Sequence, residues 1–179
     1  FWASGGCLVV RADLYHKVGG LDHDLYAHME EVDLCWRLKN AGYRIGYIGS
    51  STVYHVGGSV ISYGSPQKLY YNFRNSLILL LKNERGSKLL WLFPLRLVLD
   101  GLAGIQLLLQ GKFRHTYTIV KAHFHFYRSL GKWLQRRRDN KKIITARNDA
   151  GIFPGSIVSA YFIGRKKTFP KLGWKPPKL

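Results

Sequence analysis

Apolar residues recur at helical spacing along most of the chain, and this pattern predicts its main elements. Side chains three or four positions apart lie on the same face of a helix, so a run of apolar residues at that spacing indicates a helix with a buried face. A glycine pair, Gly19-Gly20, follows the shortest of these runs and is typical of a helix end. Helices are predicted over residues 12–18, 30–41, 68–82 and 89–109.

Strands are predicted where short apolar or β-branched runs lie beside glycine- and serine-rich turns. The runs are residues 7–10, 44–48 and 52–56. Residues 1–84 are thus expected to contain both strands and helices, and the family resemblance described below implies an α/β fold for them, followed by a mostly helical region over residues 85–179.

The two parts of the chain differ in charge. Residues 1–84 hold 8 Lys and Arg against 7 Asp and Glu, a net charge of +1, whereas residues 85–179 hold 20 against 3, a net charge of +17. Such an asymmetry indicates an anionic partner for the second part, either a membrane surface or nucleic acid.

The helix predicted over residues 89–109 favours a membrane as that partner. Its few polar residues form a narrow stripe at helical spacing, namely Arg96, Asp100, Gln106 and Gln110. On an otherwise Leu-rich helix, this stripe fits a helix lying in the membrane interface better than one crossing the bilayer. Nucleic-acid binding does not require such an apolar segment.

Two cysteines, Cys7 and Cys35, are too widely spaced for a Cys-x-x-Cys cluster and too few for a disulfide scaffold, so a reducing compartment is expected. The chain opens at Phe1 with no signal-peptide pattern. It is therefore expected to be the C-terminal part of a longer protein, with part of any active site lying upstream.

Three carboxylates, Glu30, Glu31 and Asp33, fall in the first turn of the helix predicted over residues 30–41. The helix dipole favours negative charge there, which tends to keep these groups ionised and able to accept a proton or bind a cation. The pattern also fits structural roles, since the glutamates can simply complement the dipole and Asp33 can pair with Arg37 four positions on.

Five further residues are candidates for binding. His55 ends a predicted strand before a glycine-rich loop and is either a metal ligand or a hydrogen-bonded packing residue. Arg74 either reaches a diphosphate or is a charge on a helix surface. Trp2 with the Gly5-Gly6 pair either lines an acceptor or sugar pocket or begins a strand.

Several ordered motifs together resemble a known enzyme family. They are Gly19-Gly20-Leu21-Asp22, residues 30–38, residues 41–45, His55, Tyr71 and Arg74-Asn75. Over residues 2–84 the chain resembles the C-terminal half of a family 2 glycosyltransferase, most closely the bacterial rhamnosyltransferase-like members that build polysaccharides. The basic second part is similar to the membrane-associated extension that many such enzymes carry.

The resemblance implies a GT-A, Rossmann-like catalytic fold. Residues 1–84 would form its acceptor-side half, and residues 85–179 a basic amphipathic membrane-associated region and tail. The N-terminal half, which binds the nucleotide-sugar and carries an Asp-x-Asp metal motif, would lie outside the chain. Asp22-His23-Asp24 has the letters of that motif but follows a glycine pair rather than a β-α-β unit, so it is not assigned this role.

The resemblance also implies roles for the acidic group and for His55. Glu31 takes the position of the general base, with Glu30 and Asp33 beside it in the catalytic group, although the family usually has Asp there. His55 matches a histidine that helps to bind the metal, Mg²⁺ or Mn²⁺, and the diphosphate. The implied reaction is an inverting transfer in which Glu31 deprotonates the acceptor hydroxyl.

These observations predict a metal-dependent glycosyltransferase at the cytoplasmic face of the inner membrane, of which the fragment alone is inactive. Its expected partners are a nucleotide-sugar donor, a lipid-linked or polysaccharide acceptor and an anionic membrane surface, with no nucleic acid. Two alternatives stay open. One is a non-catalytic membrane-associated adaptor with a glycosyltransferase-like fold, which the Glu at position 31 favours. The other is a basic nucleic-acid-binding module.

Overall fold

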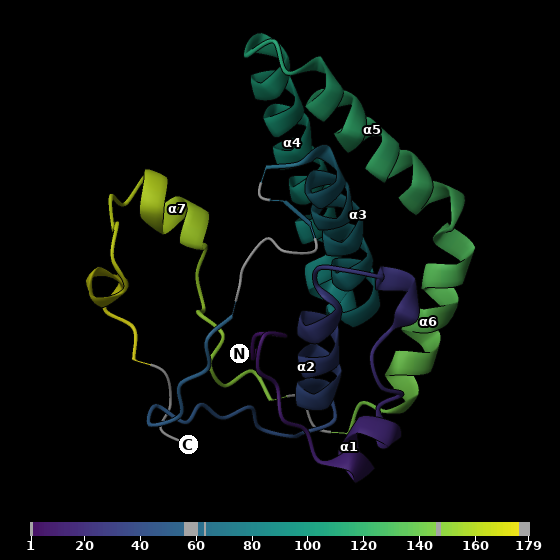
Figure 1. The fold of residues 1–179 in the computed structure, drawn as a ribbon, viewed down its shortest axis with the longest axis vertical. Coiled ribbons are helices and arrows are strands. Elements are labelled where there is room, and N and C mark those ends of the chain that lie inside the picture. Colours follow the sequence, from purple (N-terminus) through teal and green to yellow (C-terminus); the bar gives the residue numbers. More distant parts are fainter. Residues whose placement is uncertain (1, 56–60, 63, 146–147, 176–179) are drawn as a thin grey trace.

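The computed structural model describes residues 2–55, 61–62, 64–145 and 148–175. The described chain folds into helices joined by loops (Figure 1). The α-helices are α1 (Ala12–Lys17), α2 (Glu30–Asn40), α3 (Pro66–Asn83), α4 (Gly86–Leu109), α5 (Phe113–Arg128), α6 (Leu130–Lys142) and α7 (Ile157–Phe162). Two 3₁₀ turns complete the set, η1 (His23–Leu25) and η2 (Phe169–Leu172).

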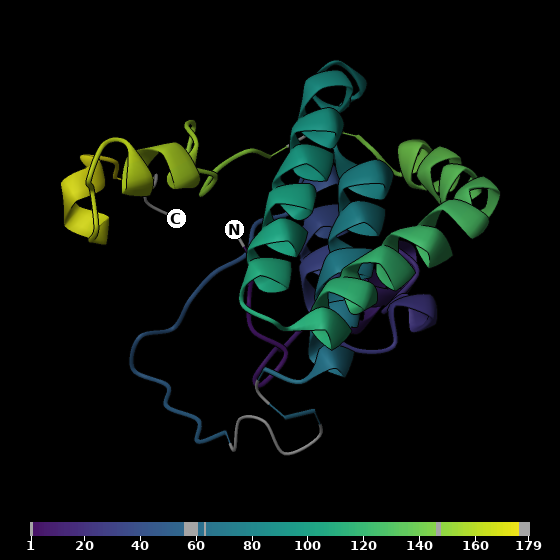
Figure 2. The same cartoon turned by 90° about the horizontal axis from the view of Figure 1, so that it is seen from above.

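The predicted α/β, Rossmann-like fold is wrong, because no residue in the described ranges lies in a strand. Residues 7–10, 44–48 and 52–55 are irregular, and Val56 lies outside the described residues. An extended segment becomes a strand only when a second segment lies beside it and exchanges backbone hydrogen bonds. Tyr43 and Ile45 pack beside α1 and α2, and residues 46–55 then extend away from the helices as a long loop (Figure 2).

The four predicted helices are all confirmed, close to their predicted ends. α3 begins at Pro66 because Ser65 caps it: the Ser65 hydroxyl accepts a hydrogen bond from the Lys68 amide at 3.2 Å, and proline suits the first turn of a helix. α2 ends before Gly42, whose φ of 89° lies in the left-handed region that glycine adopts readily.

α3 is the central helix, and it packs against α2, α4, α5 and α6. Its buried face supplies Leu77, Ile78, Leu79 and Leu81 to the larger core. Phe126 of α5, Trp133 of α6 and Leu25 of η1 complete that core. A smaller core joins α1 to α2 through Val18, Leu34, Leu38 and Ala41.

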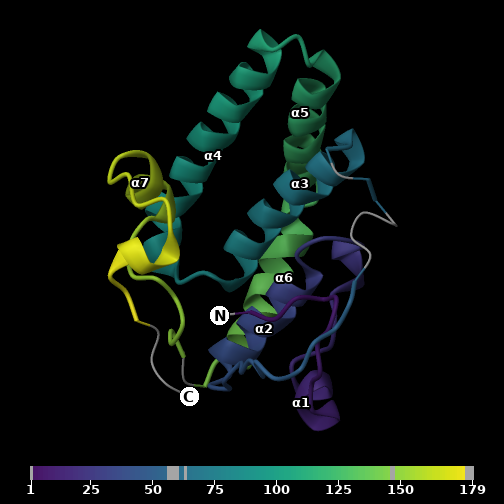
Figure 3. The ribbon, with the colours of Figure 1, turned by 60° about the vertical axis from the view of Figure 1, so that its left-hand side comes forward.

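α4 and α5 form a hairpin, joined by a short turn at one end (Figure 3). Asp100 of the predicted polar stripe is buried, pairing with Arg96 at 2.7 Å and with His123 of α5 at 3.1 Å. The side chains on the outward face of α4 are apolar and open to solvent, with Leu90 81% and Leu109 83% exposed. Through Asp100 the polar stripe therefore joins α4 to α5. The apolar face of α4 is left uncovered.

Candidate active site

A buried polar network joins the glycine–aspartate motif to α2 and α3. Arg37 donates to Asp33 at 2.9 Å and to the backbone carbonyl of Gly20 at 2.6 Å. Asp33 also accepts from Lys82 at 3.1 Å and from the Asn83 amide at 2.8 Å. This carboxylate is 0% exposed and both of its oxygens are hydrogen-bonded inside the protein, so an acceptor hydroxyl cannot reach it. The geometry therefore favours a structural role for Asp33.

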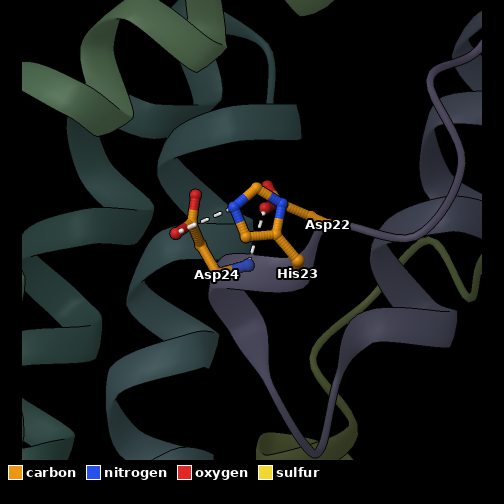
Figure 4. Close-up of side chains that lie close together, drawn as sticks. All are labelled: Asp22, His23 and Asp24. Carbon is orange, nitrogen blue, oxygen red and sulfur yellow. Dashed lines mark hydrogen bonds and ion pairs between the residues drawn. The ribbon is translucent and has the colours of Figure 1, made fainter.

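Asp22 and Asp24 lie close to His23, and the three side chains together offer ligand atoms within 4.8 Å of one another (Figure 4). Both carboxylates are already paired, since Asp22 accepts from Lys82 and Asp24 pairs with Lys132 at 2.6 Å. Burial would raise the pKa of Asp22, but the Lys82 ammonium outweighs it and holds that pKa below its usual value. This acidic group therefore ties the loop to α3 and α6.

The backbone just before α2 is strained. Tyr26, His28 and Met29 have φ values of 62°, 64° and 77°, although each carries a side chain that disfavours this region. Asn75 of α3 holds the segment in place, because its buried amide donates to the carbonyls of Leu25 and Ala27 at 2.9 Å and of His28 at 2.7 Å. Such strain persists only where the surroundings impose it, and it is common at functional sites.

Arg74, the predicted diphosphate contact, is engaged within the protein. Its guanidinium donates to the carbonyl of Asp24, to Asn75 at 3.0 Å and to the Tyr70 hydroxyl at 3.4 Å. It also stacks over the Tyr71 ring, with its central carbon 5.6 Å from the ring centroid. These contacts favour the structural interpretation of Arg74 over the binding one.

Four of the predicted site residues come together at one corner, which we call the Gly5 corner: Gly5, Gly6, Glu31 and His55. A Cβ placed on Gly5 would lie 3.7 Å from the Glu31 Cβ, and one placed on Gly6 would lie 3.4 Å from the His55 Cγ. The glycine pair thus lies between a half-buried carboxylate and an exposed imidazole. Trp2 lies three positions earlier and is 49% exposed.

Glu30, beside this corner, has a different environment. Burial raises the pKa of Glu30, and the neighbouring Glu31 adds to that rise. One oxygen of Glu30 and Nε2 of His28 are buried without a hydrogen-bond partner among the described residues. Buried polar atoms are nearly always paired in folded proteins, so these two are exceptions among the described residues.

The described residues supply too few ligands at the Gly5 corner to hold a metal by themselves. Glu31 and His55 offer one carboxylate and one imidazole there. Mg²⁺ is commonly bound by one or two carboxylates together with substrate phosphates. A cation at this corner would therefore need further ligands, such as the oxygens of a substrate phosphate.

A cleft between the start of α3 and α5 was not predicted from the sequence. It has a volume of about 490 Å³, and its lining includes Tyr70, Arg114, Lys121 and His125. The signal was present in the sequence, because positions 114, 121 and 125 fall on one face of a helix. We return to this α3–α5 cleft below.

Curated proteins with similar sequences are rhamnosyltransferases. The N-acetylglucosaminyl-diphospho-decaprenol L-rhamnosyltransferase of Mycobacterium tuberculosis, found in two strains, is 34% identical over 100 residues, which cover 56% of this chain and 32% of that protein. The rhamnosyltransferase WbbL of Escherichia coli is 33% identical over 54 residues, or 30% of this chain and 20% of that protein.

The chain spans about a third of the length of the mycobacterial relative. No protein-family profile and no solved structure matches it. The similarity nevertheless confirms the resemblance that the motifs indicated. By sequence the chain is thus related to bacterial rhamnosyltransferases.

Proposed function

We propose that the chain forms the acceptor-side part of a glycosyltransferase in which Glu31 is the general base. The observation that carries this proposal is the Gly5 corner, where side-chain-free backbone lies between Glu31 and His55. The similarity to rhamnosyltransferases supports the reaction class. The donor-binding residues of the enzyme would lie outside this chain.

In the proposed mechanism Glu31 accepts the proton of an acceptor hydroxyl as its oxygen attacks the anomeric carbon of the donor sugar. The bond to the nucleoside diphosphate breaks on the opposite face, so the configuration inverts. Glu31 suits this role better than Asp33, whose oxygens are taken by Arg37, Lys82 and Asn83. The absence of side chains on the glycine pair leaves room for the acceptor beside the carboxylate.

His55 is the residue of this chain that would help to hold a divalent cation, together with the diphosphate. When bound, the cation would supply positive charge that stabilises the departing diphosphate. Within the chain itself, the strained segment that Asn75 holds would fix the start of α2 and so the direction of the Glu31 side chain.

A lipid-linked acceptor is proposed from the mycobacterial relative, whose name gives a diphospho-decaprenol acceptor. The exposed apolar face of α4 supports a membrane location, since this helix is long and apolar enough to cross a membrane by length and composition. Its paired Arg96 and Asp100, together with the basic charge of residues 85–179, favour a position at an anionic surface. We therefore propose peripheral attachment at the cytoplasmic face.

The test is sugar transfer by the protein that carries this chain, comparing the unmodified protein with Glu31→Gln. Loss of a general base is expected to lower kcat by about 10²–10⁴-fold. Asp139→Asn, a carboxylate on α6 that pairs with Lys142, is the matched control and should keep the unmodified rate. Equal turnover in all three proteins would remove Glu31 from the mechanism, whereas no turnover in any of them would favour the adaptor alternative.

A further inference from the structure

The α3–α5 cleft has a lining of cations and aromatic rings. Tyr70 and Tyr71 come from the first turns of α3, and Arg114, Tyr117, Lys121 and His125 from one face of α5. No carboxylate is among its described lining residues. A concave surface with two permanent cations and no opposing acid attracts anions, because the low-dielectric walls strengthen the local field.

A chain of hydrogen bonds fixes the donors at the base of this cleft. The Tyr70 hydroxyl accepts from Arg74 at 3.4 Å and lies 2.6 Å from Nδ1 of His125. The tyrosine hydroxyl can both accept and donate, so it links the Arg74 guanidinium to the His125 imidazole. Lys121 lies 6.0 Å from the centroid of the Tyr70 ring, so its charge stays close to the same point.

The outer side of α5 beside the cleft is apolar and uncovered. Tyr117, which lines the cleft, is 66% exposed, and Phe124 is 60% exposed. Phe113 and the outward face of α4 continue this apolar surface at the hairpin end. An amphiphile with its anionic group in the cleft could therefore lay its hydrocarbon chain against these residues.

We infer that the α3–α5 cleft binds the diphosphate group of a lipid-linked ligand, with Arg114 and Lys121 as its main charge contacts. The inference rests on the proposed function, because a lipid-linked diphosphate is the acceptor proposed above. Arginine and lysine donate charge-assisted hydrogen bonds to phosphate oxygens, which are stronger than neutral ones. The tyrosines give flat surfaces against which a sugar or the first isoprenyl unit can pack.

The test is equilibrium binding to the full 179-residue chain in detergent micelles, measured by titration calorimetry. The probes are farnesyl diphosphate, inorganic pyrophosphate and uridine diphosphate. The cleft variant is Arg114→Gln with Lys121→Gln. The matched control is Arg138→Gln with Lys141→Gln, which removes the same charge from exposed positions of α6.

Farnesyl diphosphate is expected to bind about tenfold or more tightly than the two probes without a lipid chain, because its apolar part is also buried. The cleft variant should weaken its binding by about tenfold or more, and the control pair should not. Glu31→Gln should bind normally, so that a failure of transfer and a failure of binding can be told apart. Unchanged binding in the cleft variant, equal weakening in the control, or no preference for the lipid probe would each overturn the inference.

Discussion

Gly5 lies directly against Glu31: a Cβ added at Gly5 would be 3.7 Å from both the Cβ and the Cγ of the glutamate. The chain segment that opens the described structure therefore forms one wall beside the first turn of α2. His55 lies against the next glycine, so three segments far apart in the sequence meet at this corner. Their meeting places the predicted base and the predicted metal ligand against two successive glycines.

A larger side chain at Gly5 should interfere with the base without unfolding the protein. Gly5→Leu would displace Glu31, and a small misplacement of a catalytic group is expected to lower kcat by about 10–100-fold. Gly5 is exposed, so the urea midpoint should be unchanged. Gly131→Leu is the control, because a side chain there meets open space. Normal transfer by Gly5→Leu would argue that Glu31 does not act at this corner.

Asn75→Ala should loosen the strained segment before α2. The variant leaves the half-buried carbonyls of Ala27 and His28 without their shared donor, at a cost of about 1–3 kcal/mol per unsatisfied group, whereas the Leu25 carbonyl keeps the Ala27 amide. Stability is measured by urea unfolding, and kcat should fall in the fraction that is still folded. Asn72→Ala, a half-buried position on the same helix, should change either quantity little. A stable, fully active Asn75→Ala protein would contradict this role.

Lys82→Met should be strongly destabilising. Its ammonium pairs with both Asp22 and Asp33, so the substitution leaves two buried carboxylates short of a cation. Breaking a buried pair in this way costs about 3–5 kcal/mol of the free energy of unfolding. Lys141→Met, at an exposed position, should stay within about 0.5 kcal/mol. Equal stability of the two variants would mean that the network contributes nothing.

Stability should fall on acidification because of Asp22 and Asp24. Lysine partners outweigh burial and lower the pKa of each carboxyl in the folded protein. A carboxyl whose pKa is lower in the folded than in the unfolded protein stabilises the fold at any pH above its unfolded-state pKa, which is about 3.9 for Asp. This stabilisation is lost as the pH falls through the pKa of the carboxyl in the folded protein. Urea unfolding between neutral and acidic pH should show this loss.

Asp22→Asn should flatten the acid limb of that pH profile. It should also lower stability near neutral pH, where Asp22 is ionised and paired. Asp149→Asn removes a carboxylate from an exposed pair with Arg85 and should keep the unmodified profile. An unchanged slope for Asp22→Asn would show that this carboxyl has the same pKa in both states.

The full chain should bind anionic lipid vesicles through α4. Replacing Leu90 and Leu102 by Ser removes exposed apolar side chains and should weaken co-sedimentation with vesicles by about tenfold or more. Val9→Ser, an equally exposed apolar position away from α4, is the control. Salt should weaken binding only in part, since the apolar contribution is not screened. Salt-sensitive binding to duplex DNA with no lipid affinity would favour the nucleic-acid alternative.

Sequence periodicity sufficed for α1 to α4, whereas the separate bounds of α5, α6 and α7 were not predicted. Residues 30–41 and 68–82 were predicted nearly to their ends, because helical hydrogen bonds are local and the apolar spacing identifies the buried face. The ion pair between Asp33 and Arg37 was likewise visible as a spacing of four positions. The motifs also indicated the relationship to rhamnosyltransferases.

The strands were predicted wrongly because a strand depends on a partner that the local sequence does not contain. Residues 7–10 and 44–48 have the residue types of strands, yet they lie in loops. The same limit applied to polar residues whose contacts are distant in sequence. Nothing near Asn75 shows that it holds the segment before α2, and nothing near Lys82 shows that it joins Asp22 to Asp33.

The sequence by itself determined the four predicted helices, the charge asymmetry and the position of Glu31 in the acidic first turn of α2. A helix and its first turn depend on residues a few positions apart, and the charge asymmetry depends on composition alone. Only the tertiary structure decided which acidic group is left open: it buries Asp33 among cations and places Glu31 beside Gly5. The physical reason is that a carboxylate's role depends on the charges and space around it, and these come from segments that only folding brings together.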